Sequence, residues 1–261
     1  MAKITAIQAQ KRKGRYNIFI DGQYRFPVNE EVLIKYQLHK GQEITTEQIT
    51  NITNAEQIAK AYNRALDFLS YQLRSEKEII DDLQKHEFVA DEIELVLKKL
   101  RTNRLINDLE YAKSYVRTMK NTSDKGPRII CQKLRQKGIG ENDIDEALQE
   151  FSTEEQLENC FKIASKLNNK YRRESFKNKV QKIKQGLLTK GFSNSIITQA
   201  IDQLDIAKDD DTEFNKLKIA GEKLLRRYDH HPDLKQKQKI KMSLYRKGFS
   251  LDEINRFIDE Y

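Results

Sequence analysis

The residues of this chain with the clearest capacity for chemistry form two basic segments in which cations alternate with apolar or aromatic side chains. KYRRESFKNKVQKIK, residues 170–184, combines seven bases with Tyr171 and Phe176, and KQKQKIKMSLYRK, residues 235–247, has the same character. Cations in this arrangement bind phosphate groups or acidic protein surfaces. The formal net charge is +8, and residues 1–20 contain five bases and no acid. The sequence therefore favours a polyanionic or acidic partner, with solvated helix faces that only maintain solubility as the alternative.

Motifs for catalysis or metal binding do not accompany these cations. The chain has no P-loop, GxGxxG, HExxH or GxSxG motif. His230 and His231 have no third ligand at a suitable spacing, and the acids at 209–211 lack the alternation of a calcium loop. Cys131 and Cys160 form no CxxC pair, and we expect both to be buried as small hydrophobic side chains. We therefore predict a protein that is not an enzyme and holds no cofactor or metal.

Both basic segments belong to a unit that recurs four times. When the copies are aligned on Phe88, Ile139, Phe192 and Phe249, each has an isoleucine nine residues earlier and a leucine five residues earlier. These pairs are Ile79 and Leu83, Ile130 and Leu134, Ile183 and Leu187, and Ile240 and Leu244. After the anchor, apolar residues at i, i+3, i+4 and i+7, such as Ile93, Val96, Leu97 and Leu100, mark one face of a further helix. A third helical stretch precedes each pair, so the unit consists of three helices in about 50 residues.

A Lys-Gly dipeptide ends the middle helix in three copies, at 137–138, 190–191 and 247–248. Glycine at this place is typical of a left-handed helix C-cap. Ser250 and Glu253 then form the pattern of a capping box that opens the next helix. The first copy has His86 and Glu87 in the corresponding place, so we expect its turn to differ.

The first fifty residues have a different pattern. β-Branched and aromatic residues predict strands between 3 and 27, and Asp21-Gly22 predicts a two-residue type I′ hairpin turn. We expect Pro27 to end the last strand, a short helix near 29–37 and a turn at 40–41. Stretches near 121–127 and 205–212 are expected to be loops between units.

Together these patterns predict a mostly α fold: an elongated, curved array of four tandem three-helix repeats with a small N-terminal β-hairpin or sheet. The predicted divisions are 1–52 for the N-terminal extension and 53–104, 105–152, 153–207 and 208–261 for the repeats. Each unit alone buries too few apolar side chains to offset its loss of chain entropy, and we therefore expect the units to stack. No apolar run is long enough to cross a bilayer and the start lacks a signal peptide, so we predict a cytoplasmic protein without a membrane partner.

Several phrases resemble the RecX family of recombination regulators. They are ALDFLSYQLRSEKEIIDDL at 65–83, INDLEYAKSYV at 106–116 and KGPRIICQKLRQKGI at 125–139. Within them, Asn107-Asp108 followed by Tyr111-Ala112 and the Lys-Gly-Pro-Arg of 125–128 match the family's phrases. The resemblance is strongest over about 60–150, and it departs at His86-Glu87, where many members have glycine.

The resemblance implies a non-enzymatic, monomeric modulator of the RecA recombinase that lies in the helical groove of the RecA filament on single-stranded DNA. It further implies inhibition of strand exchange, ATP hydrolysis and coprotease activity, and a role in DNA repair and the SOS response. The candidate contacts to RecA or DNA are Lys125, Arg128, Lys133, Arg135, Lys137, Arg172, Arg173, Lys177, Lys179, Lys182, Lys184, Lys235, Lys237, Lys239, Lys241 and Arg246.

Composition and spacing alone support two other readings. One is a basic helical-repeat protein that binds nucleic acid without RecA, and the other is a helical scaffold for a different protein. Binding to bare DNA that weakens steeply with salt would distinguish the first of these from RecA regulation.

Overall fold

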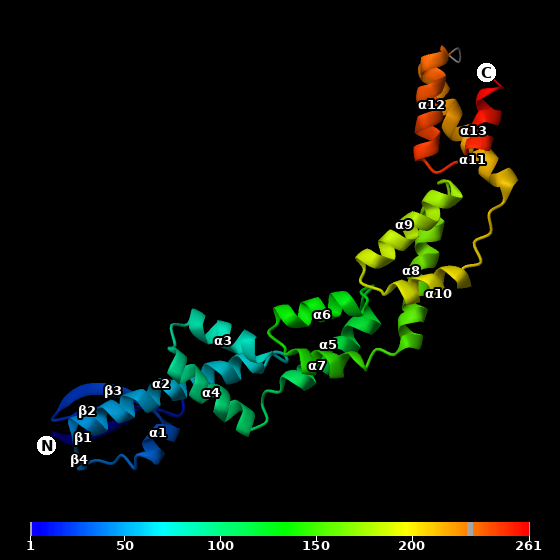
Figure 1. Ribbon diagram of the computed structural model, residues 1–261. Coiled ribbons are helices and arrows are strands. Elements are labelled where there is room, and N and C mark those ends of the chain that lie inside the picture. The colour runs from blue at the N-terminus through cyan, green and yellow to red at the C-terminus, as the bar shows by residue number, and fades with distance from the viewer. Residues whose placement is uncertain (1, 229–231, 261) are drawn as a thin grey trace. The chain divides into compact units, whose positions relative to one another are not determined.

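The computed structural model describes residues 2–228 and 232–260 and is mostly helical (Figure 1). Its helices are α1 (Glu30–Lys35), α2 (Thr46–Leu69), α3 (Glu76–Lys85), α4 (Ala90–Thr102), α5 (Asp108–Thr122), α6 (Pro127–Gln136), α7 (Glu141–Leu148), α8 (Thr153–Lys170), α9 (Phe176–Thr189), α10 (Asn194–Gln203), α11 (Asp210–Leu225), the 3-10 turn η1 (Arg226–Tyr228), α12 (Leu234–Arg246) and α13 (Leu251–Ile258). The chain divides into two compact units: residues up to 112 with 135–143, and residues 113–134 with those from 144 onward.

The N-terminal strands form one antiparallel sheet in the order β3-β2-β1-β4. The strands are β1 (Ala2–Ala9), β2 (Arg15–Ile20), β3 (Gln23–Asn29) and β4 (Glu43–Ile44). Asp21 and Gly22 join β2 to β3 with φ angles of 50° and 82°, which confirms the predicted type I′ turn. The prediction that Pro27 ends a strand is wrong, because β3 continues to Asn29. β3 is an edge strand that pairs with β2 alone, and proline is tolerated in such strands because one side of the strand forms no ladder.

The long helix α2 links the sheet to the first repeat. Its N-terminus is closed by a capping box of Thr45 and Gln48. Ile52 and Ala59 of α2 join the core of the sheet, whereas Ala61 and Ala65 join the core of α3 and α4. The blue and cyan part of Figure 1 shows α2 lying along the sheet. The division predicted between residues 52 and 53 therefore falls inside a continuous helix.

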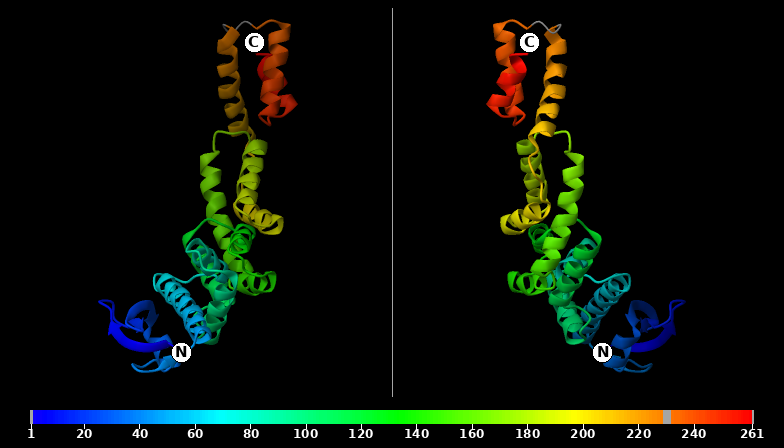
Figure 2. Two further views of the ribbon diagram at one scale, coloured as in Figure 1. Left: turned by 90° about the vertical axis from the view of Figure 1, so that its left-hand side faces the viewer. Right: turned by 90° about the vertical axis from the view of Figure 1, so that its right-hand side faces the viewer.

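Three-helix repeats follow, as predicted. All eight aligned isoleucines and leucines of the middle helices are at most 2% exposed: Ile79, Leu83, Ile130, Leu134, Ile183, Leu187, Ile240 and Leu244. α8, α9 and α10 share one core, and α11, α12 and α13 share another, seen as the orange and red bundle of Figure 2. Gly221 of α11 allows the close approach of α13, because a Cβ there would overlap the ring of Phe257.

Helix N-termini follow local capping chemistry. Ser75, Ser152 and Ser250 each form a capping box with the Glu three residues later, which confirms the pattern at Ser250. The expected loop at 205–212 is too long, because Asp209 is the N-cap of α11 and the two following aspartates lie in its first turn. Acidic residues at that end of a helix oppose the positive end of its dipole.

The two cysteines differ. Cys160 is buried, and burial raises the pKa of its thiol to about 12. Cys131 is only half-buried, contrary to expectation, because it directly follows the core residue Ile130 on α6 and so points about 100° away from the core. His230 and His231 lie outside the described residues. Among the described residues, no group of three His, Cys, Asp or Glu could hold a metal ion, and no helix is long and apolar enough to cross a bilayer.

Candidate functional site

The Lys-Gly turns of the later repeats dock on the preceding repeat. In the first of these contacts, Ser75 Oγ donates a hydrogen bond of 2.7 Å to the backbone carbonyl oxygen of Lys137. Gly138 follows with a φ of 82°, and a Cβ there would lie 2.7 Å from the Cβ of Lys77. The turn that ends α6 therefore rests against the N-terminus of α3, and only glycine fits.

The second contact uses backbone groups on both sides. Gly126 N–H donates to the carbonyl oxygen of Lys190 over 2.7 Å, and Arg128 N–H donates to that of Gly191 over 3.1 Å. Gly191 has a φ of 91°, and a Cβ there would lie 2.7 Å from Cγ1 of Ile129. The Lys190 ammonium forms an ion pair with Asp124. The turn after α9 thus caps the N-terminus of α6.

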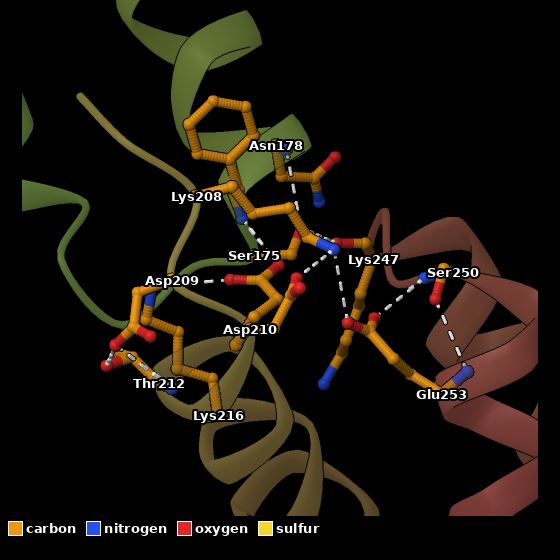
Figure 3. A network of polar contacts seen from close by, with 12 residues as sticks. Ser175, Asn178, Lys208, Asp209, Asp210, Thr212, Lys216, Lys247, Ser250 and Glu253 are labelled. Carbon is orange, nitrogen blue, oxygen red and sulfur yellow. Dashed lines mark hydrogen bonds and ion pairs between the residues drawn. The ribbon is translucent and has the colours of Figure 1, made fainter. Parts of the chain in front are cut away.

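The third contact repeats the first with a different serine (Figure 3). Ser175 Oγ donates to the carbonyl oxygen of Lys247, and a Cβ on Gly248 would lie 2.7 Å from that hydroxyl. Lys208 Nζ lies nearby, 2.8 Å from Asp210 Oδ1 and 3.3 Å from Glu253 Oε1. The turn after α12 therefore docks on α9 as the turn after α6 docks on α3.

The missing glycine of the first copy now has a physical explanation. The expectation that this turn differs is wrong, because Glu87 has a φ of 65° and the turn is left-handed, as it is at Gly138, Gly191 and Gly248. Among the described residues before α3, the chain forms the sheet and the helices α1 and α2, and Glu87 itself is exposed. A side chain at this position costs backbone strain of about 1 kcal/mol, and the exposure of Glu87 is consistent with a turn that is not docked on another repeat.

A second kind of contact escaped the sequence analysis. Asp108 Oδ1, at the start of α5, accepts a 2.8 Å hydrogen bond from the backbone N–H of Glu76 on α3. Glu213 Oε1, at the start of α11, accepts a 2.7 Å hydrogen bond from the N–H of Phe176 on α9. Each acid thus caps the middle helix of the preceding repeat. An acid near the start of the following helix is the only signal in the sequence, and it is indistinguishable from ordinary helix-dipole compensation.

Lys137, one of the candidate contacts, takes part in the first docking contact. Its Nζ lies 2.5 Å from Glu78 Oε1, and this hydrogen bond raises the pKa of Lys137. Burial would raise the pKa of Glu78, but the hydrogen bonds from Lys137 and from the Ser75 backbone prevail and lower it. The geometry assigns Lys137 a structural ion pair.

Several other candidate cations are also paired. Arg135 binds Glu141 with two hydrogen bonds of 2.6 and 2.7 Å, and Lys125 lies 3.3 Å from Asp124. Lys182 pairs with Glu174. Lys133 is exposed, and we do not count it among the uncompensated cations. Compensated charges of this kind contribute less to the attraction of a polyanion than free ones.

The remaining candidates form no ion pair with another described residue. They are Arg128 on α6; Arg172, Arg173, Lys177, Lys179 and Lys184 in and before α9; and Lys235, Lys237, Lys239, Lys241 and Arg246 on α12. Most are exposed, while Lys179, Lys237 and Lys241 are half-buried. Burial and the neighbouring Lys216 lower the pKa of Lys179. Met242 and Tyr245, each 50% exposed, lie among these cations in the sequence of α12. The middle helices of the last two repeats therefore carry the largest uncompensated positive charge among the candidates.

These features define a class: a tandem three-helix repeat protein whose repeats interlock through docked turns and display cations on their middle helices. The chain belongs to the RecX regulatory protein family. The model of the regulatory protein RecX N-terminal domain matches residues 2–45, and those of its first and second three-helix domains match 61–100 and 107–148. The model of the third three-helix domain matches twice, at 154–201 and 211–258.

Individual relatives agree with this assignment. The regulatory protein RecX of Levilactobacillus brevis is 49% identical over 258 residues, covering 99% of this chain and 97% of the relative. That of Bacillus subtilis is 41% identical over 261 residues, covering 100% and 99%. A crystal structure of regulatory protein RecX, 53% identical, matches 77% of this chain and all of that chain with a TM-score of 0.72. RecX from Lactobacillus salivarius, 48% identical, matches 59% of this chain and 99% of that chain with a TM-score of 0.57.

Proposed function

We propose that this protein binds the RecA recombinase filament on single-stranded DNA, within its helical groove, and lowers its ATPase, strand-exchange and coprotease activities. Membership of a regulatory family along nearly the whole chain carries this proposal. The protein acts as a monomer in the cytoplasm, where it limits recombination and the SOS response. It does so by binding, without catalysis.

The charge distribution supports such a role physically. A groove that exposes acidic protein surface beside DNA phosphates attracts the uncompensated cations of α9 and α12. Contacts on successive repeats reinforce one another, because binding of one repeat raises the effective concentration of the next at the filament. Modest contacts on several repeats can therefore give tight binding overall.

The test is RecA-driven ATP hydrolysis on single-stranded DNA with increasing amounts of this protein. We expect the rate to fall as the protein approaches stoichiometry with RecA. An unchanged rate at stoichiometric protein, with the protein folded by circular dichroism, would contradict the proposal. Electron microscopy of the same mixture would show whether the added density lies in the groove.

The cations of α12, which pair with no described acid, favour one alternative: a nucleic-acid-binding protein that acts without RecA. Its signature is tight binding to bare DNA together with no effect on RecA. Its affinity would fall steeply with salt, since each phosphate contact releases counterions.

A further inference from the structure

A basic cavity lies in the N-terminal part of the chain, far along the sequence from α9 and α12. It has a volume of about 450 Å³ and lies between the loop joining β1 to β2 and the second half of α2. Arg12, Lys13 and Arg15 line it from the loop side, and Lys60 and Arg64 line it from α2. This loop belongs to the basic N-terminal segment that the proposed function leaves unused.

The loop is held in place by backbone hydrogen bonds at both ends. Gln10 N–H donates to the carbonyl oxygen of Arg15 over 2.8 Å, and Glu30 N–H donates to that of Gly14 over 2.9 Å. Gly14 has a φ of 72°, which allows the reversal between the strands. The cations of the loop are therefore presented on an ordered support.

Two of the five lining cations are already compensated. Glu56, only 3% exposed, lies 2.7 Å from Arg15 Nη1 and also accepts a 2.6 Å hydrogen bond from the N–H of Asn29. Arg64 binds Asp82 through two hydrogen bonds of 2.8 and 2.7 Å. The first pair joins β2 to α2, and the second joins α2 to α3.

The other three cations have no such partner. Arg12 and Lys13 are exposed, Lys60 is half-buried, and none forms an ion pair with another described residue. Lys60 Nζ donates a 3.4 Å hydrogen bond to Oε1 of Gln57, a neutral group that leaves its charge uncompensated. Asp67 is the acid among the lining residues, so positive charge remains in excess around the opening.

The uncompensated cations lie on two sides of an open cavity. This arrangement matches the spaced charges of a phosphodiester chain better than it matches a single small anion. The chain would run between the loop and α2, with the side-chain amide of Asn63 able to donate to a phosphate or sugar oxygen. An acidic peptide is a weaker fit, because the lining offers little apolar surface to anchor its side chains: Leu66 is the large aliphatic side chain there.

We propose that this cavity is a nucleic-acid site in which Arg12, Lys13 and Lys60 bind the phosphodiester backbone of a single strand. It adds a contact in the N-terminal domain to those proposed for the later repeats. This proposal does not depend on the proposed regulation of RecA, because it concerns binding of nucleic acid in the absence of RecA.

The test is fluorescence anisotropy of a labelled 20-nucleotide oligo-deoxythymidine titrated with the full chain at several salt concentrations. The variant is Arg12→Glu/Lys13→Glu/Lys60→Glu. The matched control is Arg25→Glu/Lys40→Glu/Lys98→Glu, which changes the net charge equally at exposed cations that do not line the cavity. Thermal melting by circular dichroism verifies that both variants fold.

We expect the cavity variant to bind at least tenfold more weakly than the control at 100 mM salt. The slope of log K against log salt should fall by about 2, because each single-strand phosphate contact contributes about 0.7. Equal affinities and slopes for the two variants would overturn the proposal. So would an absence of DNA binding by the unmodified protein at low salt, even if that protein inhibits RecA.

A second measurement needs no variant. Acetylation of lysines by a small reagent, read by mass spectrometry, should be suppressed by the oligonucleotide at Lys13 and Lys60 and unchanged at Lys40. Full modification of Lys13 and Lys60 in the presence of saturating oligonucleotide would refute the site. An RNA oligonucleotide of the same length, run in parallel, shows whether the site distinguishes the two sugars.

Discussion

Ser75, a fully buried residue at the N-terminus of α3, donates its hydroxyl hydrogen to the carbonyl oxygen of Lys137, 62 residues later in the chain. Ser175 makes the same bond to Lys247. Both serines also accept a hydrogen bond from a backbone N–H of their own helix, so one hydroxyl closes a helix start and a neighbouring helix end together. Polar caps therefore connect successive repeats at these two places.

The docked glycines should be intolerant of any side chain. Gly191→Ala places a Cβ 2.7 Å from Ile129 in addition to the cost of a positive φ. We expect a loss of more than about 2 kcal/mol in the free energy of unfolding, measured by urea denaturation. Gly22→Ala is the matched control, because Gly22 has a φ of 82° with no atom within 4 Å of an added Cβ. Equal losses of unfolding free energy for the two variants would show that the close contact at the docked turn does not destabilise Gly191→Ala.

The turn after α3 should respond to substitution in the opposite direction, because here glycine should not destabilise the protein. Glu87→Gly removes a side chain from an exposed left-handed residue. We expect stability to stay constant or to rise by up to about 1 kcal/mol, since relief of strain competes with the greater freedom of glycine in the unfolded chain. A clear loss of melting temperature would mean that the Glu87 side chain has a structural role.

The ion pair between Glu78 and Lys137 should make stability depend on pH. The pKa of Glu78 is lower in the folded chain than its ordinary value, so the pair contributes fully above that value. The contribution disappears as pH falls from the ordinary glutamate pKa through the lower folded pKa of Glu78. Lys137→Met should flatten the change in urea midpoint between pH 6 and pH 3, whereas Lys40→Met should not. Identical pH profiles for the two variants would show that the ion pair does not contribute to the pH dependence of stability.

Truncation of an aligned leucine should destabilise the protein strongly. Leu134 is fully buried, and Leu134→Ala should cost about 2–5 kcal/mol through lost burial and a residual cavity. Thermal melting by circular dichroism measures it. Leu188→Ala on α9, where the leucine is 37% exposed, is the control and should cost much less.

Charge reversal near α9 should weaken partner binding without unfolding the chain. Arg172→Glu/Arg173→Glu/Lys184→Glu changes three cations that pair with no described acid, and it leaves the Lys182–Glu174 pair intact. We expect at least a tenfold higher protein concentration for half-inhibition of RecA ATP hydrolysis, with unchanged helicity. The control Arg25→Glu/Lys40→Glu/Lys98→Glu has the same net charge. Equal inhibition by both variants would place the contact surface on other residues.

Local patterns were sufficient to predict most of the secondary structure. Period-3.6 stripes identified the helices, and Asp21-Gly22 identified the hairpin, because each depends on residues close together in sequence. The errors at Pro27 and at 205–212 arose where context decides: an edge strand tolerates proline, and an aspartate cluster can begin a helix as readily as it can form a loop.

The sequence by itself determined that helices recur in groups of three, that their aligned isoleucines and leucines are buried, and which family the chain resembles. Only the tertiary structure decided that Lys137 pairs with Glu78, that Asp108 and Glu213 cap helices of the preceding repeat, and that Lys60 faces the loop of Arg12. Buried positions recur periodically in the sequence of a helix, because the core residues of one helix face follow the same spacing. A polar contact between residues 30 to 70 positions apart obeys no spacing, so it becomes visible only when the helices are placed together.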